Sequence, residues 1–193
     1  MARSRPNRLE ARPARFQDRP GFTMLELLVA VGLLVVIITV ALTSINSDMP
    51  NTRLKDAARD VFNNIQSAKL GAIKDNSNYA VIFNTAGQSY SVVSGCHQDA
   101  TGGTVLRTVN LTTTYKGNVA FGDSGHGPVT LTGPPPVPLA QLANLVFRPD
   151  GTVLQTGGVY LANIKNGAYA VIVPSLSGGA SIFRWKGTAW ASY

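Results

Sequence analysis

The hydrophobic residues of this chain follow three patterns, and the first is a long uninterrupted run. Residues 21–42 read GFTMLELLVAVGLLVVIITVAL, and no Lys, Arg, Asp or Glu occurs from Leu27 to Ser47. A helix rises about 1.5 Å per residue, so this run would cover roughly 30 Å, the thickness of a bilayer hydrocarbon core. The run therefore predicts a membrane-spanning helix with a single carboxylate, Glu26, near its start.

The second pattern, which follows the apolar run, is a helical repeat of three and four residues. Its apolar positions are Leu54, Ala58, Val61, Ile65, Ala68 and Ala72, with Ala57 and Phe62 beside them. Its polar positions are Lys55, Asp56, Arg59, Asp60, Asn63, Asn64 and Gln66. This spacing predicts an amphipathic helix with one face available to a sheet, ending near residues 75–78. Pro50 lacks a backbone donor, which predicts a kink or a short melted turn before this helix.

The third pattern is a series of short alternating segments separated by turn residues. The segments predicted as strands are 79–84, 89–94, 105–112, 118–121, 145–148, 158–164, 168–173, 181–185 and 188–192. The proline-rich stretch 124–142 among them predicts an irregular surface loop. Many short strands after one helix indicate an antiparallel sheet packed on that helix, an α+β fold.

The basic residues before the apolar run predict how that run is oriented in the membrane. Residues 1–21 hold six of the 17 basic residues and two of the 10 acidic ones, so the formal charge of +7 falls to +3 without them. A net charge of only +3 on the rest of the chain does not by itself imply nucleic-acid binding. A basic segment stays on the cytoplasmic side, which would place the C-terminal part across the membrane.

The position of Gly21 indicates where the chain is processed. A secretory signal peptide has its small-residue cleavage site after the apolar region, whereas Gly21 lies before it. Cleavage between Gly21 and Phe22 would leave the apolar helix in the mature protein, with a free amine on Phe22. A carboxylate inside an apolar bundle needs a partner. We therefore expect Glu26 to pair with the terminal ammonium of a neighbouring copy or homologue.

Two stretches of the sequence carry a family resemblance. Gly21-Phe22-Thr23-Met24-Leu25-Glu26 and the apolar run resemble the class III leader of type IV prepilins and type II secretion pseudopilins. In that family a prepilin peptidase cuts after the glycine, and the new N-terminal residue is methylated. The resemblance implies that residues 1–21 are a cleaved leader, that Phe22 is N-methylated and that Glu26 serves assembly.

The second stretch is similar to the GspH/FimT family of minor pseudopilins and minor pilins. Leu54 to Phe83 resembles the region after the membrane helix, and Val146 to Thr152 resembles a later Phe-x-Pro-x-Gly element. The resemblance implies a type IV pilin-like α+β fold, with a long N-terminal helix, first membrane-spanning and then amphipathic, packed on antiparallel sheet. It divides the chain into a leader (1–21), a transmembrane and assembly helix (22–45), an amphipathic half (46–78) and a periplasmic β-rich domain (79–193).

Side chains suited to catalysis or metal binding are few. Cys96 is the single cysteine, so no internal disulfide forms. Cys96, His97 and the distant His126 lack the four-ligand spacing of a zinc site, and we expect Cys96 and His97 to be solvent-exposed loop residues. Too few acids surround Asp123 for calcium, and Gly102-Gly103 follows no strand-to-helix pattern of a phosphate loop. The sequence predicts no enzyme, no metal and no cofactor.

Basic and aromatic residues interleave near residue 185. They are Phe183, Arg184, Trp185 and Lys186, followed by Trp190 and Tyr193. Such interleaving can bind single-stranded nucleic acid or stack on a partner. Alternation along a strand places Phe183 and Trp185 on one face, which favours sheet packing over partner binding, and partner binding over DNA. Arg184 and Lys186 are the candidates for a partner or DNA contact.

The resemblance implies a non-enzymatic minor pseudopilin of type II secretion. Such a protein is a single-pass inner-membrane protein with a periplasmic domain, and it enters the pseudopilus after assembly. The expected partners are the prepilin peptidase, the major and other minor pseudopilins, the inner membrane and secreted cargo. One alternative is a FimT-like type IV pilus minor pilin for pilus assembly or DNA uptake. Another is a membrane-anchored periplasmic binding domain outside any filament.

Overall fold

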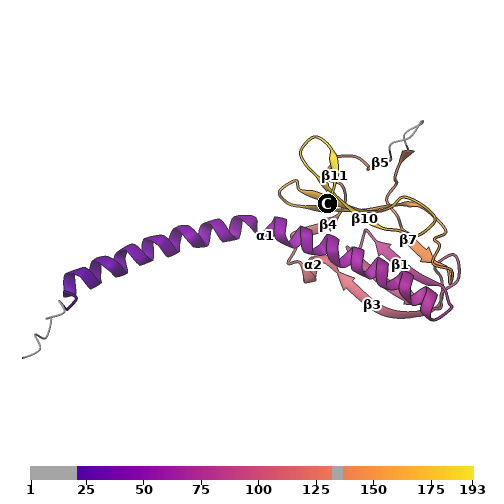
Figure 1. Ribbon diagram of the computed structural model, residues 1–193, viewed down its shortest axis with the longest axis horizontal. Helices are drawn as coiled ribbons and strands as arrows, with labels where there is room; N and C mark the ends of the chain where they lie inside the picture. The colour runs from indigo at the N-terminus through magenta and orange to yellow at the C-terminus, as the bar shows by residue number, and fades with distance from the viewer. Residues whose placement is uncertain (1–20, 132–136) are drawn as a thin grey trace, which may run out of the picture. The chain divides into compact units, whose positions relative to one another are not determined.

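The computed structural model describes residues 21–131 and 137–193, except for the side chains of residues 40–47. The predicted leader, apart from Gly21, lies outside the described residues. Helix α1 (Met24–Lys74) comes first, and the chain divides into two units, Met1–Ser44 and Ile45–Tyr193. The two units are described separately below, and Figure 1 shows the elements of each.

In the first unit, every described side chain of α1 is exposed. Within the part of the chain that the structure describes, no helix is long and apolar enough to cross a membrane. The membrane span expected at residues 22–45 therefore stays a prediction.

In the second unit, α1 continues through Pro50 without a break, so the melted turn expected there is absent. Proline removes one intrahelical hydrogen bond, and packing of the following turns holds the helix together. Seven residues of α1, each at most 1% exposed, form its covered face: Leu54, Ala57, Ala58, Val61, Ile65, Ala68 and Ala72. The amphipathic pattern is thus confirmed, with one exception. Asn64, expected on the polar side, is buried.

Two antiparallel sheets meet this face of α1. The first sheet has the order β3-β2-β1-β7 and the second has the order β11-β10-β9-β8-β4. The first is formed by β1 (Tyr79–Asn84), β2 (Ser89–Ser94), β3 (Thr104–Asn110) and β7 (Asn144–Phe147). The second is formed by β4 (Val119–Phe121), β8 (Gly157–Asn163), β9 (Ala168–Val173), β10 (Ser181–Trp185) and β11 (Trp190–Ser192). A short helix, α2 (Leu111–Thr114), replaces the end of the strand predicted at 105–112.

One hydrophobic cluster joins α1 to the inner faces of both sheets. It takes Val81 and Phe83 from the first sheet, and Val171 and Val173 from the second. Alternate residues of the same strands point the other way, as the two-residue period of a strand requires. Figure 1 shows α1 crossing this sheet layer with β1, β3 and β7 beside it. The predicted α+β fold, a helix packed on antiparallel sheet, is confirmed for this unit.

The outer faces of the two sheets are covered as well, by segments expected to be exposed. Val129 and Leu139 are buried against Tyr160, Ala170 and Ile172 on the second sheet. Between them, β5 (Thr130–Leu131) pairs with β6 (Val137–Pro138). The surface-loop prediction for 124–142 was therefore wrong for Val129 and Leu139, and its residues 132–136 lie outside the described part of the chain. Apolar residues scattered among prolines gave no recognisable period, yet they cover a sheet face that would otherwise contact water.

Candidate interaction sites

The first candidate site is the N-terminal end of α1. Its apolar side chains are highly exposed, and Met24 reaches 91%. They occupy all sides of the helix, since the described residues from Met24 to Thr39 are consecutive and exposed. A helix that is apolar all round is normally buried in a large assembly or a bilayer. This segment is therefore a candidate interaction surface.

Thr23 and Glu26 define how this helix begins. The hydroxyl oxygen of Thr23 accepts a hydrogen bond from the backbone N–H of Glu26, at 3.1 Å. That is the geometry of an N-cap residue, which satisfies one of the unpaired donors at a helix start. A glutamate in the first turn also suits the positive end of the helix dipole. Glu26 therefore has a local role at the helix start, and its pairing with another chain stays a prediction.

The second candidate site is a polar cluster between α1 and the first sheet, which the sequence did not reveal. The Tyr90 hydroxyl donates to Asp60 Oδ2 at 2.6 Å and accepts from Asn64 Nδ2 at 2.9 Å. Tyr115 donates to the same Asp60 oxygen at 3.4 Å, and Arg107 lies 3.6 Å from the other one. Asp60 and Asn64 are one turn apart on the helix, which is the only sign of this cluster in the sequence.

Burial and the Asp60 carboxylate both favour the neutral phenols in this cluster. Burial first, and then the hydrogen bond to Asp60, raises the pKa of Tyr90 far above its usual range. Burial and the charge of Asp60 raise the pKa of Tyr115 to about 12. The cluster therefore ties the helix to β2 by hydrogen bonds rather than presenting an ionisable group for chemistry.

The third candidate site is a cleft of about 310 Å³ between α1 and the second sheet. We call it the cationic cleft, and its lining residues are Asp48, Asn51, Thr52, Lys55, Tyr169, Arg184 and Tyr193. Arg184 lies opposite Tyr169 in the register of β10 and β9, with its guanidinium 6.0 Å from the Tyr169 ring centre. Lys55 and Arg59 both approach the Tyr193 ring, each at 5.6 Å from its centre.

The structure separates the two basic residues that the sequence grouped together. Arg184 lines the cationic cleft, whereas Lys186 follows the end of β10 and is not among its lining residues. Two residues of α1 are the cations nearest to Arg184 instead: Lys55 lines the cleft with it, and Arg59 lies beside the cleft on the Tyr193 ring. Sequence reasoning missed them because they are more than 120 residues away along the chain, in a segment read only as a helix face.

The aromatic residues of the same region lie on the opposite face of the second sheet. Phe183 and Trp190 pack partly buried against the cluster around Tyr160. Trp185 stacks on His126, with ring centres 4.5 Å apart, and the Trp190 indole N–H donates to the Gly127 carbonyl at 3.1 Å. The prediction that Phe183 and Trp185 share a face and serve packing is confirmed. Their rings are engaged within the sheet layer and its covering segment.

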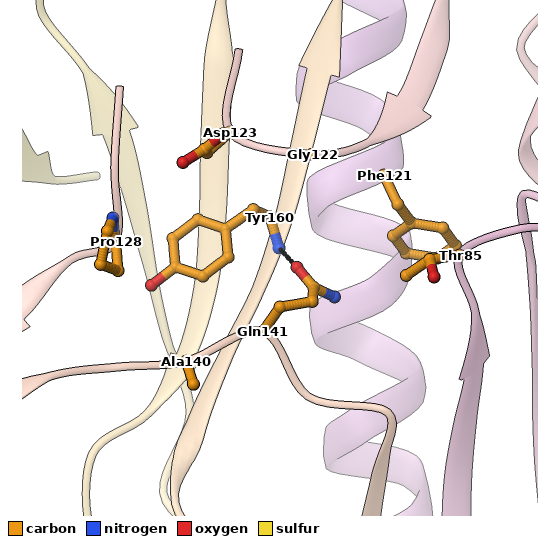
Figure 2. A pocket seen from close by; sticks show the side chains of 8 residues that line it. All are labelled: Thr85, Phe121, Gly122, Asp123, Pro128, Ala140, Gln141 and Tyr160. Atoms are coloured by element: carbon orange, nitrogen blue, oxygen red, sulfur yellow. Dashed lines mark hydrogen bonds between the residues drawn. The ribbon is translucent and has the colours of Figure 1, made fainter. Parts of the chain in front are cut away.

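A hollow of about 470 Å³ lies beside Tyr160 at the edge of the second sheet. Figure 2 shows its lining, with the Tyr160 ring between Pro128 and Gln141, and Thr85 and Phe121 on the far side. The polar groups there have internal partners. Gln141 accepts the Tyr160 backbone N–H at 3.0 Å, and the Tyr160 hydroxyl donates to the Leu139 carbonyl at 2.6 Å. This hollow therefore results from packing and contains no converging reactive groups.

The cysteine does not lie where the sequence placed it. Cys96 is buried, at 5% exposed, in the cluster with Ala80, Val93 and Val146 that covers the outer face of the first sheet. Burial raises the pKa of its thiol. The expectation of an exposed residue was wrong for Cys96 and right for His97. Among the described residues, no three His, Cys, Asp or Glu side chains come together as a metal site would need.

Comparisons with known proteins give likenesses of structure only. The fold is similar to the minor pseudopilin EpsH from the type 2 secretion system of Vibrio cholerae, at 12% identity and a TM-score of 0.48, over 68% of this chain and 97% of that one. It is also similar to the type IV minor pilin FimU of Pseudomonas aeruginosa, at 13% identity. In one crystal form the TM-score is 0.47, over 70% of this chain and 99% of that one. In another the TM-score is 0.46, over 73% and 94%.

No protein-family model matches this chain, and no curated protein sequence matches it. The similar structures are those of a minor pseudopilin and a minor pilin. These are the two classes that the sequence resemblance named.

Proposed function

We propose that this chain is a minor pseudopilin of a type II secretion system, a structural subunit without catalytic activity. Its apolar helix joins the helical core of a short filament, and its sheet domain contacts other subunits or secreted cargo. The type IV pilus minor pilin is the closest alternative, because the same helix and domain would serve either filament.

One observation carries this proposal: the contrast between the exposed apolar helix and the covered domain that follows it. In the second unit, α1 buries its apolar face on two sheets, and the outer faces of those sheets are covered as well. In the first unit, residues such as Leu27, Leu33 and Ile37 are at least 60% exposed. An exposed apolar surface of this kind marks a site of protein or membrane interaction.

Processing before assembly follows from the residues at the start of this helix. A prepilin peptidase cuts between Gly21 and Phe22, and Phe22 is then N-methylated. A Cβ added to Gly21 would meet no described atom within 4 Å, so packing in the structure does not explain a glycine there. Recognition by a peptidase would explain it. The carboxylate of Glu26 then pairs with the terminal ammonium of a neighbouring subunit.

Before assembly, the protein is held in the inner membrane by residues 22–45, with residues 79–193 in the periplasm. The uncharged sequence from Leu27 to Ser47 and the basic residues before Gly21 support this orientation. The partners in this state are the lipid bilayer and the peptidase, and in the filament they are the major and other minor pseudopilins.

The proposal is tested by the mass of the membrane-associated protein, from cells with and without an active prepilin peptidase. We expect loss of Met1 to Gly21 and gain of one methyl group only where the peptidase is active. Gly21→Val should block this processing. Gly32→Val is the matched control, because a Cβ at Gly32 also meets nothing within 4 Å of the described structure. Residues 1–21 still attached in peptidase-active cells would refute the proposal.

A further inference from the structure

We infer that the cationic cleft is a binding site for a carboxylate-bearing segment of another protein. The inference rests on the proposed function only where it identifies that protein as a neighbouring filament subunit. The site itself is argued from the charges, the geometry and the size of the cleft.

Positive charge converges on this cleft without a matching number of acids. Lys55 of α1 and Arg184 of β10 line the cleft, and Arg59 of α1 lies beside it against the Tyr193 ring. None of the three forms an ion pair with a described carboxylate. Asp48 is the single acidic side chain among the described lining residues. A hydrogen bond with Lys55, followed by the charges of Arg59, Lys55 and Arg184, lowers the pKa of Tyr193. An anion entering the cleft would therefore be attracted by all three cations.

The cations are held in place by aromatic rings before any ligand binds. The Arg59 guanidinium donates to the Tyr193 hydroxyl at 3.3 Å, while Arg184 rests near the Tyr169 ring. Tyr169 and Tyr193 contact each other edge to face, with ring centres 5.5 Å apart. Cation–π contacts fix the side chains without neutralising their charge. Less conformational entropy is then lost when a ligand is bound.

The size and shape of the cleft favour a carboxylate over a nucleic acid. About 310 Å³ accommodates one or two acidic side chains, and arginine offers two parallel donors that match a carboxylate. Single-stranded nucleic acid needs open ring faces for stacking and a row of cations along its backbone. Tyr169 is only 5% exposed, so it offers no open ring face, and Lys186 lies outside the cleft.

The test measures binding of a labelled, capped oligoglutamate peptide to the full-length chain in detergent, by fluorescence anisotropy at low and high salt. We expect salt-sensitive binding that Arg184→Gln and Lys55→Gln each weaken about tenfold, because each removes a charge-assisted hydrogen bond. Lys186→Gln is the matched control, since it removes the same charge two residues from Arg184. Its affinity should stay within about twofold of wild type, as for an exposed charge outside the site.

Other outcomes would overturn the inference. If all three variants lowered the affinity for the peptide equally, the cause would be a general charge effect. If the wild type did not bind the peptide, the cleft would not be a carboxylate site. Tighter binding of a short oligodeoxythymidine with the same dependence on Arg184 would assign the cleft to nucleic acid. None of these results depends on leader processing, so the inference and the proposed function can fail separately. Circular dichroism of each variant confirms that the domain is folded.

Discussion

The two parts of helix α1 are both rich in apolar residues, yet only the second part has them covered. Leu54 is 1% exposed, whereas Leu34 in the first part is 56% exposed. In the second part, most apolar residues keep to one face, which two sheets of the same chain bury, while Leu70 and Ile73 stay exposed. In the first part they surround the helix, and no single face of one domain could cover them all. Exposed apolar surface of this kind is typical of a site of protein or membrane interaction.

The largest change in free energy is expected from removing the carboxylate of Glu26, in the uncovered part of α1. Glu26→Ala should leave the domain folded but weaken association with other subunits. Loss of one partner of a buried charge pair costs about 3 to 5 kcal/mol, because the other charge stays uncompensated. Co-purification with other pseudopilins measures this. Asp56→Ala removes an exposed acid from the covered part and serves as the control. Wild-type co-purification of Glu26→Ala would count against the pairing.

The same substitution in the two parts of the helix tests the comparison directly. Leu54→Ala should destabilise the domain by about 2 to 5 kcal/mol, the range for large-to-small changes in a core. Leu34→Ala should change the stability of the domain by at most about 0.5 kcal/mol, as exposed substitutions do. Urea unfolding of the full chain in detergent, followed by tryptophan fluorescence, measures both. Equal effects would mean that the first part is also folded against the domain.

A smaller loss is expected from the polar cluster beneath the covered part. Tyr90→Phe removes the hydroxyl that donates to Asp60 and accepts from Asn64. Leaving buried polar groups without a partner costs about 1 to 3 kcal/mol. Tyr193→Phe is the control, since Tyr193 is 48% exposed and its hydroxyl interacts with the cationic side chains of Lys55 and Arg59 rather than with buried groups. If both variants unfold at the same urea concentration, Tyr90 does not anchor the helix to β2.

The smallest effect on the stability of the domain is expected from the two buried tyrosines, and only at alkaline pH. The folded state raises the pKa of Tyr115 from 10.0 to about 12, and that of Tyr90 upward as well. The unfolded chain therefore loses these protons first as the pH rises, so stability is fully present below pH 10 and declines towards pH 12. The double variant Tyr90→Phe/Tyr115→Phe should show a flatter decline. Urea midpoints measured across this pH range test the prediction, and parallel curves for the two proteins would contradict it.

The sequence by itself determined the elements of the fold and the chemistry of the first helical part. Periods of three to four residues gave the face from Leu54 to Ala72, and alternation with turn residues gave the strands β1, β2, β9 and β10 almost residue by residue. Gly21, Phe22 and Glu26 were likewise singled out from their order along the chain, and their roles in processing and assembly stay predictions. These features depend on neighbours close in sequence, where spacing alone decides which side chains share a face.

Only the tertiary structure decided which distant side chains meet. Cys96 and Val129 lie in segments without a regular period, and they are buried because each segment covers the outer face of a sheet. Asn64 is buried because Tyr90, on another element, satisfies its amide. Arg184 lines the same cleft as Lys55, whereas Lys186 does not. The packing of β10 beside α1 brings Arg184 and Lys55 together. Contacts between elements depend on sheet order and register, which no local pattern in the sequence specifies.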